Sequence, residues 1–307
     1  MSDTTSSLSR KITGAGDLQS VVRTMKAVAA SSVGQYENSV RALAGYSRTV
    51  ELGLGVCFRA AGTAPLVAAG QERSGTVVAV VFGSDQGLVG QFNDVVAEFA
   101  AQTLAELSAK PKAKPGAKPA AKLEIWAVGE RVHARLADAG LTPQALFLVP
   151  GSVTAITPLV GQILVEHETR HGTEQGAALF LFHNRPTSGV AYAPGMQRLL
   201  PLDDAWRREL AKRAWPTACL PEVLAGDAAT LRLLIREYLF VSLFKACAES
   251  LASENASRLA AMQRADKNIQ ELLEELSGTF HRLRQNGIDE ELFDVVSGFE
   301  ALSAEAK

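Results

Sequence analysis

The segment that decides the fold is "ASENASRLAAMQRADKNIQELLEELSGTFHRL", residues 252–283. Apolar residues recur in it at alternating steps of three and four, with Asp266 as the one polar member of the series. The apolar members are Leu259, Met262, Ile269, Leu273, Leu276, Phe280 and Leu283. This heptad spacing predicts a long helix whose apolar seam must be covered by another helix.

The helical pattern continues in both directions, over residues 228–303, and no proline occurs from residue 222 to the end of the chain. A helix of that length spans about 110 Å. A compact chain of this size is about 50 Å across. The C-terminal helix is therefore predicted to extend beyond any globular domain.

A second helix, over residues 8–58, is the one segment of comparable length. Its apolar and small residues also recur at helical steps, among them Leu18, Val22, Met25 and Ala29. Several glycines weaken this helix, which is therefore expected to need a partner. We expect residues 1–58 and 222–307 to form a long antiparallel coiled coil.

The middle of the chain, residues 75–202, has a different period. Short apolar runs rich in β-branched and aromatic residues predict buried strands, and helical candidates separate them. The strands are expected at 76–82, 123–128, 144–149 and 177–183, and the helices at 91–109, 129–140 and 153–171. This alternation predicts a mainly parallel sheet. The fold class is therefore α/β, with an α/β domain inserted between the two long helices.

Residues 109–122 interrupt this domain with five lysines and three prolines. Proline at this density prevents a helix, and the segment has nothing apolar to bury. We expect a solvated insertion loop. A basic tether for nucleic acid is the alternative, but no aromatic residue stands among the lysines to stack on bases.

The composition is that of an ordinary globular protein. The 307 residues are 47% hydrophobic and 21% charged, with a net charge of −2, so nothing points to nucleic acid or an anionic membrane. No secretory signal is visible at the N-terminus, and the apolar runs are too short to span a bilayer. Cys57, Cys219 and Cys247 are scattered, which favours reduced thiols.

Motifs for catalysis are weak. No G-x-x-x-x-G-K-[ST] phosphate-binding loop occurs, and "GSDQGLVGQFN" (83–93) is best interpreted as a tight turn between strand and helix. "HETRH" matches H-E-x-x-H, so His167 and His171 could hold zinc with Glu168 as general base. The favoured interpretation is an exposed end of an amphipathic helix.

Several segments together resemble one family. "SENASRLAAMQRADKN" (253–268) fits S-E-x-A-x-R-x-x-A-M-x-x-A-x-x-N, the signature of F-type ATP synthase gamma subunits. In the same order as in that family come "KI" (11–12), "VVRTMKAVAAS" (21–31), "SDQGLVGQFN" (84–93), "LLPL" (199–202) and "IDEELFDVVSGFEAL" (288–302). The resemblance covers almost the whole chain.

This resemblance implies a central stalk, or rotor, subunit that couples transmembrane ion flow to ATP synthesis or hydrolysis. The expected partners are the alpha and beta subunits, the epsilon subunit and the c-subunit ring. Catalysis would occur in beta, so no catalytic residue, cofactor or metal is expected in this chain. The expected location is the cytoplasmic face of the bacterial inner membrane, as a peripheral protein. A free-standing coiled-coil scaffold is the alternative function.

The resemblance also assigns candidate residues. Arg23, Met25, Arg258 and Glu290 match family positions that couple the shaft to the catalytic subunits. On spacing alone, Met25 could belong to the seam, and Arg258 could lie on a solvated face. At the C-terminal tip, an apolar bearing surface is expected from Phe293, Val296, Phe299 and Leu302, together with Val295. Roughly half of these apolar residues are alternatively expected to bury against the N-terminal helix.

Overall fold

The computed structural model describes residues 4–60, 76–109, 122–172, 177–187, 191–219, 221–222 and 227–305. Nearly all of the Lys-Pro-Ala segment, residues 110–121, lies outside them. The chain forms two compact units: unit 1 comprises residues 1–29 and 259–307, and unit 2 comprises residues 30–258. The domain boundaries given above remain a prediction.

Unit 1 is a pair of helical segments. It contains the start of α1 (Thr5–Ala60) and the end of α6 (Asp227–Glu305), both of which are unbroken helices as predicted. Val22, Met262 and Ile269 are its buried centre. Ala15, Met25, Ala261, Ala265 and Leu273 pack around them. The predicted apolar seam between the two ends of the chain is confirmed at these residues, whereas Leu18, which was expected in it, is 54% exposed.

Unit 2 is built on a five-stranded sheet in the order β3-β2-β1-β4-β5. The strands are β1 (Val77–Phe82), β2 (Leu123–Val128), β3 (Ala145–Phe147), β4 (Ala178–Arg185) and β5 (Ala193–Leu200). The first four are parallel neighbours. The apolar runs of β1, β2 and β4 are buried on both faces, as parallel strands require. β3 is a short edge strand in which Leu146 is 46% exposed, so the prediction of a buried strand over 144–149 is wrong. The predicted mainly parallel sheet is confirmed.

The fifth strand was missed by the sequence analysis. β5 pairs antiparallel with β4 at the edge of the sheet, and it contains Pro194 and Gly195. An edge strand tolerates a proline that an interior strand would not, so no continuous apolar run marks it. The short helix α5 (Asp204–Lys212), whose first turn is capped by Asp203, was missed as well.

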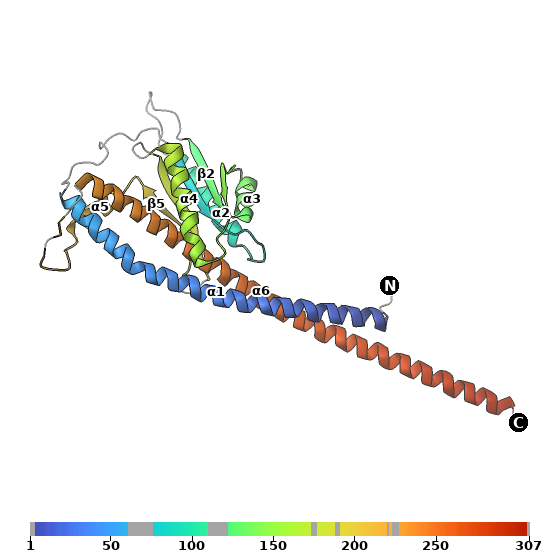
Figure 1. The fold of residues 1–307 in the computed structure, drawn as a ribbon. Helices are drawn as coiled ribbons and strands as arrows, with labels where there is room; N and C mark the ends of the chain where they lie inside the picture. The colour runs from blue at the N-terminus through green and yellow to red at the C-terminus, as the bar shows by residue number, and fades with distance from the viewer. Residues whose placement is uncertain are drawn as a thin grey trace. The chain divides into compact units, whose positions relative to one another are not determined.

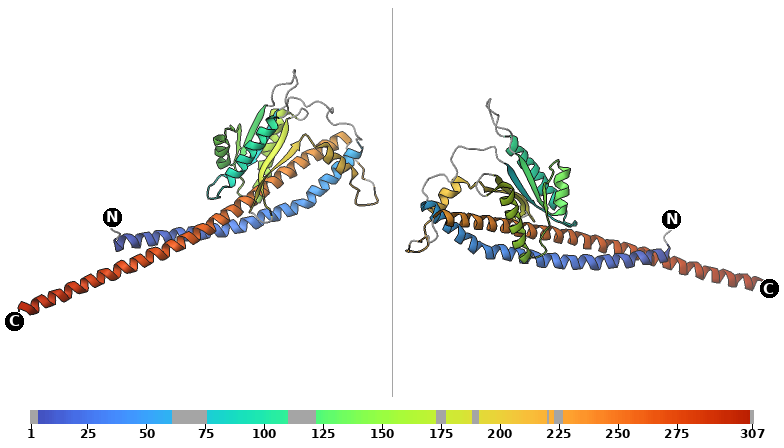
Figure 2. Two further views of the ribbon diagram at one scale, coloured as in Figure 1. Left: turned by 180° about the vertical axis from the view of Figure 1, so that it is seen from behind. Right: turned by 45° about the horizontal axis from the view of Figure 1, so that its top comes forward.

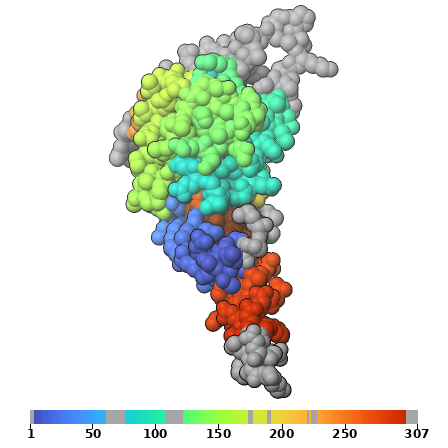
Figure 3. Space-filling model, turned by 90° about the vertical axis from the view of Figure 1, so that its right-hand side faces the viewer, coloured from blue at the N-terminus to red at the C-terminus, as the bar shows by residue number. Residues whose placement is uncertain are grey.

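Helices cover both faces of the sheet (Figures 1 and 2). α2 (Phe92–Ala109) and α3 (Glu130–Asp138) pack on one face through residues such as Val96 and Leu136. α4 (Val153–His171) and the first part of α6 pack on the other through residues such as Ile163 and Leu243. In the space-filling view, the segments from α2 to α4 form one continuous surface (Figure 3).

α4 begins where the sequence predicted a cap. The Ser152 hydroxyl accepts a hydrogen bond from the Ala155 amide at 3.3 Å, which satisfies one of the free donors of the first turn. Among the described helices, none has an apolar stretch long enough to span a membrane.

Candidate functional site: the helical pair and the joint to the sheet

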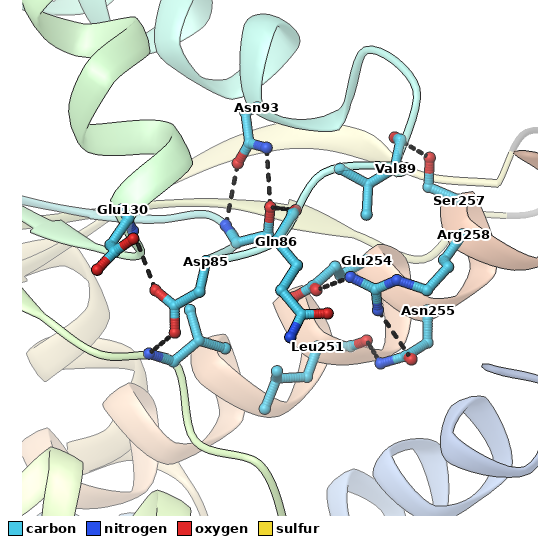
Figure 4. Close-up of polar contacts among 12 residues, drawn as sticks. Asp85, Gln86, Val89, Asn93, Glu130, Leu251, Glu254, Asn255, Ser257 and Arg258 are labelled. Atoms are coloured by element: carbon cyan, nitrogen blue, oxygen red, sulfur yellow. Dashed lines mark hydrogen bonds and ion pairs between the residues drawn. The ribbon is translucent and has the colours of Figure 1, made fainter. Parts of the chain in front are cut away.

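The turn from β1 to α2 (83–91) is held by its own polar side chains. The Asn93 side-chain oxygen accepts from the Ser84 amide at 3.0 Å, and the Asn93 side-chain nitrogen donates to the Ser84 hydroxyl at 2.8 Å (Figure 4). Gly83 leaves room here, since a Cβ would collide with Val132. The interpretation of this motif as a tight turn is confirmed.

Asp85 ties two further segments to this turn. Its carboxylate accepts from the Glu130 amide at 3.0 Å, at the start of α3, and from the Val149 amide at 2.9 Å, just after β3 (Figure 4). A carboxylate at the first turn of a helix also interacts favourably with the helix dipole. The carboxyl ends of β1, β2 and β3 are thus linked by one side chain.

A stripe of α6 side chains binds the same edge of the sheet. Glu249 lies 2.9 Å from His183 Nε2, the Ser253 hydroxyl donates to the Asn184 carbonyl at 3.1 Å, and the Ser257 hydroxyl donates to the Val89 carbonyl at 2.5 Å. We call these three contacts the joint. Their α6 members are four residues apart, so they lie on one helix face.

The sequence analysis did not single out the joint. The signal that could have found it is the four-residue spacing of Glu249, Ser253 and Ser257 within an otherwise apolar helix face. Small hydroxyl residues on a buried face need hydrogen-bond acceptors, and neighbouring carbonyl groups provide them here.

Arg258 lies beside the joint. Its side chain is only 14% exposed and makes a 2.6 Å ion pair with Glu254, one helical turn earlier. A second hydrogen bond runs to Asn255 (Figure 4). The alternative of a solvated face is therefore wrong for Arg258. Burial raises the pKa of the Glu254 carboxyl, and Arg258 opposes that rise.

In unit 1, Asp266 binds three side chains of α1. Its carboxylate accepts hydrogen bonds from the side chains of Gln19 at 3.2 Å, Arg23 at 3.3 Å and Lys26 at 2.9 Å. Lys26, followed by Arg23, lowers the pKa of the Asp266 carboxyl. The polar member of the heptad series is therefore satisfied across the seam. The ion pair with Asp266 of α6 therefore holds the side chain of Arg23, a predicted coupling residue on α1, across the seam.

Met25 is half-buried and packs against the apolar centre of unit 1. This placement agrees with the seam interpretation of Met25. Arg23 differs, because more than half of its side chain stays exposed beside Asp266. Of the two predicted coupling residues on α1, Arg23 presents more of its side chain to solvent.

The C-terminal tip of α6 is exposed and apolar. Phe293 is 71% exposed, Val295 69% and Val296 46%. These three residues do not bury against α1, and the expectation that roughly half of the five tip residues do so stays a prediction. Glu290 is also exposed. Phe299 and Leu302 belong to α6, but their side chains lie outside the described part of the structure.

The H-E-x-x-H segment is not an exposed helix end. His167 is buried, and His171 stacks on Trp126 in β2 at 6.4 Å between ring centroids. His171 Nε2 lies 3.3 Å from Glu124 Oε2. Burial lowers the pKa of His167 to about 4, so its imidazole is neutral near pH 7. The helix end packs on the sheet because both histidines face the core.

The zinc alternative gains no support from this geometry. Glu168, which would be the general base, turns towards Arg236 at 3.8 Å. Within the described ranges, no group of three histidine, cysteine or carboxylate residues is arranged to hold a metal ion.

Comparison with known proteins agrees with this architecture. Residues 4–302 match the protein family described as ATP synthase. The "ATP synthase gamma chain" of Anaeromyxobacter sp. is 26% identical, with 92% of this chain and 93% of that protein covered. The gamma chain of Granulibacter bethesdensis is 27% identical, with 95% and 97% covered.

Solved structures show the same fold. A chain of the Euglena gracilis mitochondrial ATP synthase, described as OSCP/F1/c-ring, superposes with a TM-score of 0.56 at 18% identity, covering 98% of this chain and 95% of that one. A chain of the Tetrahymena thermophila enzyme, described as central stalk/c-ring, gives 0.54 at 20% identity, covering 80% and 99%. Because the family match extends over nearly all of the sequence and these bacterial relatives are gamma chains, the chain belongs to the gamma-chain family of ATP synthases.

Proposed function

We infer that this protein is the central-stalk gamma subunit, the rotor of an F-type ATP synthase. The observation that carries this function is the family match over residues 4–302, on a chain whose two ends form an antiparallel helical pair. Paired helices with a packed seam provide the stiffness that a rotating shaft requires.

The exposed tip suits rotation inside a ring of catalytic subunits. Exposed apolar residues on one helix usually mark a surface that meets another protein. Phe293, Val295 and Val296 offer apolar contact with few charges, so they can bear on a partner without tight ionic binding. We assign Arg23 and Glu290, whose side chains are exposed, to contact with the catalytic subunits. Met25 and Arg258, which pack within the chain, would support coupling by holding the helices in place.

The partners proposed for the chain are the alpha and beta subunits at the helical end, and the epsilon subunit and c-subunit ring at the sheet domain. The chain itself would carry no catalytic step and would transmit rotation between its partners. Its proposed location is the cytoplasmic face of the bacterial inner membrane, where it is bound as a peripheral protein.

The test is co-expression with the alpha and beta subunits of the same organism, purification through a tag on beta, and subunit counting by native mass spectrometry. We expect one copy of this chain in each alpha–beta ring, together with ATPase activity. If the ring assembles without this chain, the rotor function is rejected, and a free-standing coiled-coil scaffold becomes the leading function.

A matched pair of variants tests the tip. Phe293→Ser with Val296→Ser places polar groups on the proposed bearing, and we expect less of this chain to remain in the purified complex. Leu148→Ser is the control, because Leu148 is equally exposed but lies in the sheet domain. If the unsubstituted chain, the double tip variant and Leu148→Ser remain in the complex equally well, the tip does not contribute to the interface.

A further inference from the structure

The joint is the polar link between the sheet of unit 2 and α6, the helix that continues into unit 1. We propose that Ser253 and Ser257 are positioning residues that transmit torque from the sheet domain to the shaft. This role rests on the proposed rotor function. It assigns to two side chains a directional restraint that the apolar contacts between α6 and the sheet do not supply.

The apolar part of the contact holds α6 against the sheet but does not by itself fix the exact position of the helix. Leu239, Leu243 and Leu251 of α6 pack with the sheet core. Such packing is non-directional, because its free energy follows the apolar area removed from water. Small rotations or shifts of α6 therefore meet only a gradual resistance, because the free energy rises in proportion to the apolar area that becomes exposed.

Hydrogen bonds are directional and supply the missing restraint. The Ser253 hydroxyl is buried against the Asn184 carbonyl at the end of β4, and the Ser257 hydroxyl against the Val89 carbonyl in the turn after β1. Rotation or translation of α6 would break both bonds and leave buried carbonyl groups unpaired, which is unfavourable.

The acceptors are themselves fixed. The Asn184 side chain donates to the Phe92 carbonyl at 2.9 Å, which ties β4 to the start of α2. Asp85 holds the turn that carries Val89 to α3 and to the chain after β3. Load on the serines is therefore distributed over β1, β3 and β4 instead of falling on one flexible loop.

The experiment uses the complete ATP synthase in inverted membrane vesicles. ATP hydrolysis is measured together with ATP-driven membrane potential, followed with an anionic potential-sensitive dye that responds to either coupling ion. For Ser253→Ala with Ser257→Ala, we expect nearly unchanged hydrolysis. Each lost bond should shift the equilibrium between the engaged and the displaced position of α6 about 3- to 10-fold towards displacement, the factor that one net hydrogen bond represents. The potential formed per ATP should therefore fall.

Ser250→Ala is the matched control. Ser250 is buried on the same helix, and its hydroxyl has no hydrogen-bond partner among the described residues. We expect this variant to pump normally. Ser257→Thr keeps the hydroxyl and should restore most of the potential. If the double variant pumps as well per ATP as the unsubstituted enzyme, the proposal is wrong.

Two further results separate this proposal from its alternatives. If the double variant is missing from the purified complex, the serines serve folding only, and the torque role is rejected. Failure of the unsubstituted chain to join the complex would reject the rotor function instead. Hydrogen exchange of the isolated chain reports the Ser257 bond independently, since its loss should speed amide exchange in residues 88–93.

Discussion

Replacing Arg258 with methionine tests the energetic role of the buried ion pair beside the joint. The substitution keeps an unbranched apolar chain and removes the charge that faces Glu254 at 2.6 Å. Glu254 is 5% exposed, so its carboxylate would be left in an apolar environment without a counter-charge. Breaking a buried pair from one side costs about 3 to 5 kcal/mol. We expect about 3 kcal/mol, because Arg258 retains some exposure.

The loss of stability should depend on pH. Burial raises the pKa of Glu254 above its ordinary value of 4.5, and without Arg258 the rise becomes larger. A carboxyl with a raised folded pKa binds its proton more tightly in the folded chain. Its contribution to stability is therefore present below pH 4.5 and is lost as the pH rises through the folded pKa. Arg258→Met should be more destabilising at about pH 8 than at about pH 5.

The assay is urea unfolding followed by tryptophan fluorescence. Trp126, Trp206 and Trp215 all lie in unit 2, so the signal reports the unit that contains the pair. Arg232→Met is the control, since Arg232 is an exposed arginine of the same helix and lies within unit 2.

A double variant completes the comparison. Adding Glu254→Gln to Arg258→Met should recover most of the lost stability, because no unpaired charge remains. A loss for Arg258→Met no larger than that for the control, or one that is equal at both pH values, would refute the reasoning.

Three further predictions concern other parts of the chain. Gly129→Ala should destabilise unit 2 by about 1 to 3 kcal/mol, because φ is +116° and a Cβ would lie 2.7 Å from the Ser84 carbonyl oxygen; urea unfolding measures it. The unsubstituted protein should lose stability as the pH falls from 6.5 to about 4, since its buried neutral imidazole resists protonation, and His167→Leu should lose less over the same range; an unchanged pH profile contradicts this. Asp266→Ala should lower the thermal stability of the helical pair at low salt, with a smaller difference at about 1 M salt, where the attraction to Lys26 is screened; circular dichroism follows both.

The sequence by itself determined the architecture of this protein. The heptad series from Leu259 to Leu283 and the helical steps from Leu18 to Ala29 indicate two long helices that need each other, because an apolar stripe in water must be covered. The short apolar runs at 76–82 and 123–128 indicate buried parallel strands. These features depend on local periodicity, which is fully present in the order of residues.

Only the tertiary structure decided which polar groups meet. The edge strand β5 has no periodic apolar signal, since its pairing with β4 and not its composition places it in the sheet. The histidines of α4 are buried because Trp126 and Glu124 lie opposite them, a juxtaposition distant in sequence.

The joint is the clearest case. Ser257 and Val89 are separated by 168 residues, yet one hydroxyl binds one carbonyl there. Local sequence shows that a serine stands on a buried helix face, but not which acceptor the fold brings to it. Long-range packing sets that pairing, because the strands, the turn after β1 and α6 must all be in place before donor and acceptor can meet.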